Sequence, residues 1–99
     1  MYNKQFLAIA STEIEAQIRA MPAHFASNEF YERFAQNHSA KYKKLIHLYT
    51  ARNHDQSHAI QIVNSQLMHT VNDRFHHLAR KIRTIANPKG GDMSEWTKT

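Results

Sequence analysis

The chain has 99 residues, of which 41% are apolar and 21% are charged, so it is long enough for one domain with a modest core and too apolar to be disordered throughout. It contains no cysteine, which excludes disulfides, thiolate zinc sites and thiol catalysis. No run of about 18 apolar residues exists that could span a membrane, and the N-terminus lacks a signal-peptide pattern. We therefore expect a cytoplasmic protein with a single domain over residues 1–99.

The formal net charge is +5, and the positive charge lies mostly in the second part of the chain. Residues 41–99 hold ten of the thirteen Lys and Arg residues but only four of the eight Asp and Glu residues. Acidic residues are absent from residue 74 to residue 91. Such a step in charge suggests an acidic partner that faces the second half of the chain.

The first predicted element is a helix from Tyr2 to Met21, which Pro22 ends. The apolar residues that recur there at helical spacing are Phe6, Leu7, Ala10, Ile14, Ile18 and Met21. This stripe fits the core of the domain, and it also fits pairing with the same helix of a second chain. Because two-fold proteins match two-fold DNA sites, the sequence leaves open a homodimer through this helix.

Two shorter helices are predicted next. Ser27 is expected to cap a helix that continues through Asn37, and Ser39 is expected to cap a third helix. A polar loop over residues 52–57 then follows, because this stretch has no apolar period.

A fourth helix is predicted from about His58 to Val71, with Asp55 or Ser57 as its cap. The cap and the positions outside its apolar stripe carry hydrogen-bonding side chains with little fixed charge: Ser57, His58, Gln61, Asn64, Ser65, Gln66 and His69. Such groups read base edges in the major groove, where Gln or Asn can bind adenine through two hydrogen bonds. An ordinary polar helix surface is the alternative.

Residues 73–85 show helical apolar spacing and are predicted as a fifth helix after a break at Asn72-Asp73. The alternative is a short helix that turns into a strand from Lys81 to Ala86. Residues 87–92 are a strong turn signal, because they combine Pro with two Gly residues. In the alternative, residues 81–96 form a strand, a turn and a second strand.

Basic residues are spread over the third helix, the fifth segment and the last turn. Cations spaced along one face fit phosphate binding, because each neutralised phosphate releases counterions. The alternative is a solvated surface that keeps the protein soluble. Together with polar residues of the fourth helix, the candidate nucleic-acid-binding residues are Lys41, Lys43, Lys44, Arg52, Ser57, His58, Gln61, Asn64, Ser65, Arg74, Arg80, Lys81, Arg83 and Lys89.

A helix, a loop and a polar-faced helix between basic segments resemble a helix-turn-helix unit, although the loop is longer than the usual tight turn. With the Gly-rich turn and the late Trp96, residues 39–99 resemble the winged-helix class of small DNA-binding domains, including those of phages and prophages. The resemblance rests on element order. It implies a nucleic-acid-binding unit over 39–99 with Lys89 at the tip of the wing, and a supporting or dimerising region over 1–37.

The expected fold is therefore mainly α, with four or five helices, a helix-turn-helix unit, and a C-terminal β-hairpin wing as an open alternative. The expected function is that of a non-enzymatic regulator, transcriptional or phage-type, with duplex DNA as its partner. The competing hypothesis is an adaptor or inhibitor that binds another protein through an exposed aromatic patch. The aromatic residues available for that patch are Phe25, Phe30, Tyr31, Phe34, Tyr42 and Tyr49.

Metal binding and catalysis have weaker support in the sequence. His54 and His58 are four residues apart, but His54 falls in the predicted loop. His76 and His77 are adjacent and would point apart on a helix. No HExxH, GxSxG or Gly-rich phosphate loop occurs. We therefore expect no cofactor, no bound metal and no enzymatic activity.

Overall fold

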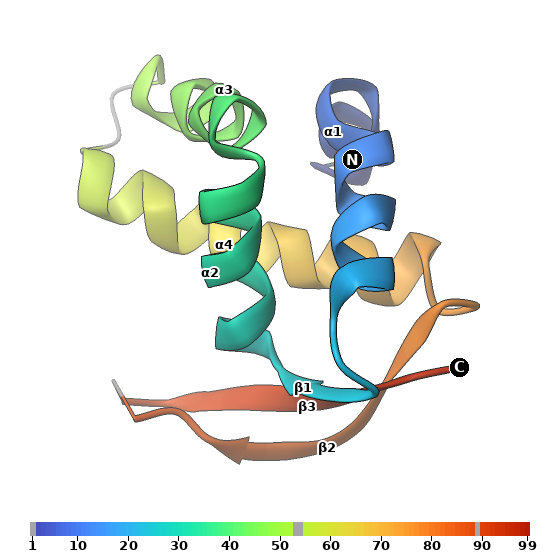
Figure 1. The fold of residues 1–99 in the computed structure, drawn as a ribbon. Coiled ribbons are helices and arrows are strands. Elements are labelled where there is room, and N and C mark those ends of the chain that lie inside the picture. Colours follow the sequence, from blue (N-terminus) through green and yellow to red (C-terminus); the bar gives the residue numbers. More distant parts are fainter. Residues whose placement is uncertain (1, 53–54, 89) are drawn as a thin grey trace.

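Helices stacked above a small antiparallel sheet make up the fold (Figure 1), in a computed structural model that describes residues 2–52, 55–88 and 90–99. The elements in chain order are α1 (Tyr2–Ala20), β1 (His24–Ala26), α2 (Ser27–Asn37), α3 (Ser39–Thr50), α4 (Gln56–Arg74), β2 (Ala79–Ala86) and β3 (Asp92–Lys98). The fold is thus mainly α with a C-terminal β-hairpin, as expected in outline. No helix in these ranges is both long enough and apolar enough to cross a membrane.

The apolar stripe of α1 packs into the domain's own core. Phe6, Ile14 and Ile18 have no exposed surface, and the helix is kinked at Ala10, where φ is −140°. Lys98 at the end of β3 closes the C-terminus of α1, because its Nζ donates to the carbonyl oxygens of Arg19 and Met21 at 2.8 and 3.0 Å. The buried residues of the stripe therefore belong to the core of this chain, and a homodimer through the helix stays a prediction.

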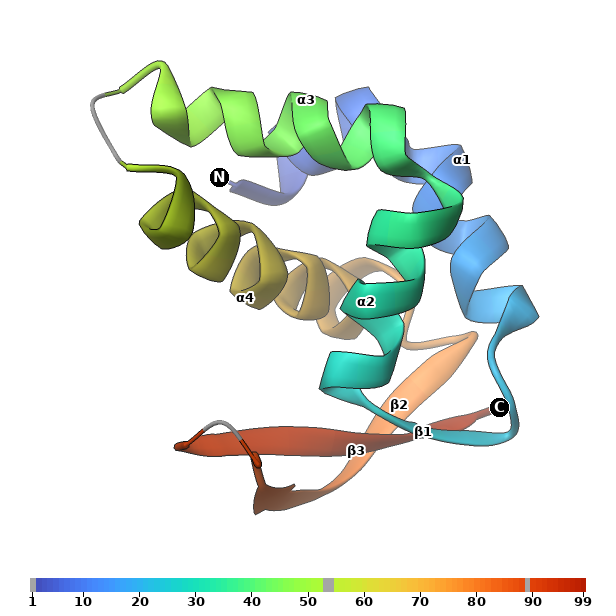
Figure 2. The same cartoon turned by 60° about the vertical axis from the view of Figure 1, so that its left-hand side comes forward.

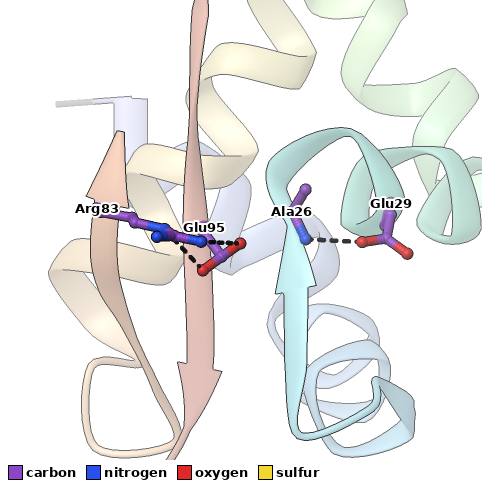
Figure 3. Close-up of polar contacts among 4 residues, drawn as sticks. All are labelled: Ala26, Glu29, Arg83 and Glu95. Atoms are coloured by element: carbon purple, nitrogen blue, oxygen red, sulfur yellow. Dashed lines mark hydrogen bonds and ion pairs between the residues drawn. The ribbon is translucent and has the colours of Figure 1, made fainter. Parts of the chain in front are cut away.

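The three-residue strand β1 was not predicted, because a segment this short has no alternation to detect. It pairs with β3, so that Phe25 lies opposite Trp96 and their rings stack with centroids 6.5 Å apart. Ser27, expected as the cap of α2, is instead its first residue and is buried. The N-terminus of α2 is closed by Glu29, whose Oε1 accepts from the Ala26 N–H at 2.9 Å (Figure 3).

The boundaries of α3 and α4 differ from the predictions at two points, while the cap of α4 is one of the two residues predicted for it. His38 rather than Ser39 occupies the cap position of α3. Asp55, not Ser57, caps α4, because its Oδ1 accepts from the His58 N–H at 2.7 Å. The break predicted at Asn72-Asp73 is wrong, since α4 continues to Arg74.

The fifth helix is also wrong, and of the alternative only the strand is present, because a turn replaces its short helix and the strand begins at Ala79. Residues 76–78 form a turn, and β2 then pairs with β3 along its whole length. This long-range ladder overrides the helical spacing, as tertiary context often does for short apolar patterns. The pairing is interrupted by a β-bulge between Lys81 and Arg83, where Ile82 is 47% exposed.

The sheet has the order β1-β3-β2, with both contacts antiparallel. The turn between β2 and β3 is held by hydrogen bonds from Asn87 N to Gly91 O and from Gly90 N to Asn87 O, at 3.0 and 2.9 Å. Gly90 and Gly91 have φ angles of 102° and 73°, which favour glycine. Lys89, the residue expected at the wing tip, lies outside the described residues.

Candidate nucleic-acid interface

One side of α4 is buried and the opposite side is exposed. The buried side includes Ala59, Val63 and Leu67, which have no exposed surface. Because a helix repeats every 3.6 residues, the residue two positions after each of these points away from the core. The exposed residues on that side are Gln61, Ser65, His69 and Asn72, which we call the α4 ridge. The ridge carries hydrogen-bonding groups and no acid.

The α4 ridge forms one wall of a cleft with a volume of about 390 Å³. The other walls come from the start of α2 and from the β2–β3 hairpin, which lies below α4 in Figure 2. Lys81, Asp92 and Ser94 line the cleft on the hairpin side. Segments distant in sequence therefore meet here, and their lining groups are mostly polar.

Lys81 reaches this cleft because of its register in the sheet. It lies opposite Trp96, whose indole is buried against the helices, so both side chains project from the face of the sheet that the helices cover. Lys81 is exposed, and it brings a cation to the cleft across from the α4 ridge. Gln61, Asn64, Ser65 and Lys81 are thus the predicted site residues that the structure brings together.

Asn64 has a partner that sequence reasoning missed. The Tyr42 hydroxyl of α3 donates to Asn64 Oδ1 at 2.6 Å. Burial raises the pKa of Tyr42, while the hydrogen bond with Asn64 lowers it less, so the hydroxyl stays protonated and remains a donor near pH 7. This bond ties α3 to α4 and orients the amide in the cleft wall.

Other lining residues were also missed, namely Tyr31, Met68 and Asn72. Asn72 had been assigned to a break, and only the continuation of α4 to Arg74 places it on the ridge. Tyr31 had been considered only as an aromatic anchor. Burial raises its pKa, and a hydrogen bond with Asn87 near the hairpin turn lowers it less. No local pattern signals that contact.

The helix α3, which carries three of the predicted cations, lies on the other side of α4 from the hairpin (Figure 2). Lys43 and Lys44 are exposed and Lys41 is half-buried, and Arg52 is exposed in the turn that follows. Ser57 and His58 are exposed in the first turn of α4 but do not line the cleft, and Arg74 is exposed at its far end. These residues therefore flank the cleft rather than line it.

Arg80 and Arg83 project from one face of the hairpin, and Lys81 projects from the other face. Arg80 lies opposite Thr97, and Arg83 lies opposite Glu95, on the face that the helices leave open. Arg83 Nε and a terminal guanidinium nitrogen donate to Glu95 at 3.1 and 3.5 Å (Figure 3). The predicted cations thus occupy three separate surfaces and do not converge on one.

The exposed aromatic patch required by the competing hypothesis is not found among the described residues. Phe25, Phe30, Phe34 and Tyr49 are at most 3% exposed. Tyr31 and Tyr42 are half-buried and packed against the core. Four of the six aromatic residues named for that patch therefore lie in the core.

Comparison with known protein families, characterised proteins and solved structures gives no match. A proposal for the function of the chain therefore rests on the sequence and the structure alone. Within the described ranges, no three His, Asp or Glu side chains gather closely enough to hold a metal ion. His54, one of the pair with metal-ligand spacing, lies outside those ranges.

Proposed function

We propose that the chain binds duplex DNA, without catalysis, through the α4 ridge and the β2–β3 hairpin. The observation that carries this proposal is the position of the ridge. Its hydrogen-bonding side chains are left uncovered by the core, and they lie across a cleft from Lys81 of the hairpin. A helix with such a face fits the major groove, where base edges offer hydrogen-bond donors and acceptors.

The cations on both sides of α4 support this orientation. A helix in the major groove lies between the two phosphate backbones that border it. The helix α3, which carries the exposed Lys43 and Lys44, lies on one side of α4, and the hairpin that carries Lys81 lies on the other. Each side of the helix therefore offers positive charge to one backbone.

The order of elements supports the winged-helix resemblance. In that reading α3, the following loop and α4 are the helix-turn-helix unit, and α4 is the recognition helix. The antiparallel hairpin that follows α4 corresponds to the wing, and β1 adds a third strand to it. The same reading makes the chain a small regulator of the transcriptional or phage type.

A titration of a fluorescent random-sequence duplex across a salt series tests the proposal. We expect the logarithm of the binding constant to fall linearly with the logarithm of the salt concentration, with a slope set by the number of phosphates contacted. Lys81→Ala should weaken binding to every sequence and reduce that slope by about one. Lys4→Ala, an exposed lysine of α1 outside the cleft, is the matched control. Affinity that does not change with salt would contradict the proposal.

A further inference from the structure

The α4 ridge lacks the side chains that recognise G·C pairs. Guanine is most often read by Arg or Lys, and cytosine by Glu or Asp. From Gln56 to Asn72, α4 contains none of these four residue types, and Asp73 and Arg74 follow them in its last turn. Apart from Arg74 in the last turn of α4, the cations near this helix belong to other elements.

The ridge does carry the side chains that recognise A·T pairs. Gln61 and Asn72 are exposed amides, and an amide can accept from adenine N6 while donating to N7. Met68 lines the same cleft and offers apolar surface to the thymine methyl group. Ser65 and His69 can bind either type of pair, so they add affinity without preference.

The positions of the two amides fit a short run of base pairs. Asn72 lies eleven positions after Gln61. At a rise of about 1.5 Å per residue, the two residues are about 16 Å apart along the helix. Base pairs are spaced by about 3.4 Å, so the two amides face base pairs about four to five steps apart. Asn64 is a positioning residue, because its Oδ1 already accepts from Tyr42.

We infer that the α4 ridge selects A·T-rich duplex DNA and reads it from the major groove, with Gln61 and Asn72 as the adenine contacts. The inference rests on the proposed DNA binding and adds the class of sequence that is recognised.

Three duplexes of equal length test this inference in the same titration. The first contains A·T pairs in mixed order, to avoid the narrow minor groove of A-tracts, and the second contains G·C pairs in the same order. The third contains inosine·cytosine pairs, which have the major groove of G·C but lack the guanine 2-amino group in the minor groove. Because the three duplexes have equal numbers of phosphates, the non-specific electrostatic contribution to affinity is the same for each.

We expect the A·T duplex to bind at least about tenfold more tightly than the G·C duplex, as two bidentate contacts allow. The inosine·cytosine duplex should bind as weakly as the G·C duplex, because the two share a major groove. Gln61→Ala and Asn72→Ala should each reduce the ratio of A·T affinity to G·C affinity several-fold. Gln36→Ala, an exposed glutamine of α2 outside the cleft, should leave the preference intact.

The contrary outcomes are distinct. Equal affinity for all three duplexes, with a steep salt dependence, would overturn the A·T inference and leave DNA binding standing. Inosine·cytosine binding as tightly as A·T would place the recognition in the minor groove and overturn the role of the ridge. Salt-independent binding, or binding to none of the duplexes, would overturn the proposed function and the inference with it.

Discussion

Ser27 joins the first half of the chain to the last strand through one buried hydroxyl group. Its Oγ accepts from Trp96 Nε1 at 3.0 Å and from Ser94 N at 3.2 Å, and it donates to Ser94 O at 3.1 Å. The same residue begins α2 and lines the cleft. This side chain therefore adds three hydrogen bonds between α2 and β3 to the pairing of β1 with β3.

Ser27→Ala should lower the free energy of unfolding by about 1–3 kcal/mol, because it leaves the buried Trp96 N–H without its acceptor. Urea denaturation followed by fluorescence measures this change, since Trp96 is the only tryptophan. Ser39→Ala, at an exposed serine that begins α3, should have a smaller effect. Equal stability of the Ser27 variant and the native chain would show that the hydroxyl contacts do not stabilise the fold.

The stability of the protein should depend on Tyr42 at high pH. Its folded-state pKa is raised above the ordinary value of 10.0. The protonated hydroxyl therefore contributes stability that is fully present below about pH 10 and is lost as the pH rises through the folded-state pKa. Tyr42→Phe removes this titration, so the free energy of unfolding should fall more steeply above about pH 10 in the native chain than in the variant. Parallel curves for the two proteins would contradict the expectation.

Individual contacts were predictable only where they are local. The Asp55 cap follows from sequence because a capping side chain binds a backbone N–H a few residues later. Ser27 and Trp96 are 69 residues apart, and Tyr42 and Asn64 are 22 apart. No spacing rule connects such pairs, so the sequence suggested Ser27 as a cap and Asn64 as a reader of bases.

At the scale of elements, four helices were predicted directly, β2 and β3 only as an alternative, and β1 not at all. The helical period is a property of consecutive residues, and it correctly located α1, α2, α3 and most of α4. Phe75, Leu78 and Ala79 have spacing that fits a helix as well as a turn followed by a strand. The choice between these is made by pairing with β3, more than ten residues later. β1 depends on the same strand and was missed for the same reason.

The hairpin turn should be sensitive to Gly91. Its φ of 73° is in the left-handed region, where a residue with a Cβ is strained by about 1–2 kcal/mol. A Cβ there would meet no atom within 4 Å, so the strain would come from the backbone alone. Gly91→Ala should therefore lower the thermal midpoint, and Gly91→Asn should recover part of the loss, because Asn tolerates this region. An Asn variant no more stable than the Ala variant would contradict this account.

At the scale of the whole molecule, the position of the charges in the sequence did not give their position in space. Neighbouring residues of a strand point to opposite faces, which separates Lys81 from Arg80. Arg83 is directed to the open face and paired with Glu95. The basic second half was therefore predictable as a composition, but its division among α3, the cleft and the open sheet face was not.

Because the cations lie on separate surfaces, paired substitutions can identify the surface that faces DNA. Replacing both Lys43 and Lys44 by Ala should weaken duplex binding and reduce the salt slope by up to about two, because these lysines lie beside α4. Replacing both Arg80 and Arg83 by Ala should change the slope much less, although the net charge falls by the same amount. If the arginine variant lost more affinity than the lysine variant, the open sheet face would be the surface that contacts DNA.

The bulge at Ile82 also affects how the molecule behaves toward its own copies. β2 is the outer strand of the sheet on its side, and its backbone could serve as a template for another chain. The inserted residue twists this strand, and the cations around it repel an identical neighbour. Ile82, an exposed large hydrophobic residue, therefore lies on a strand edge that is neither straight nor uncharged. Such an edge disfavours the growth of fibres through this side of the domain.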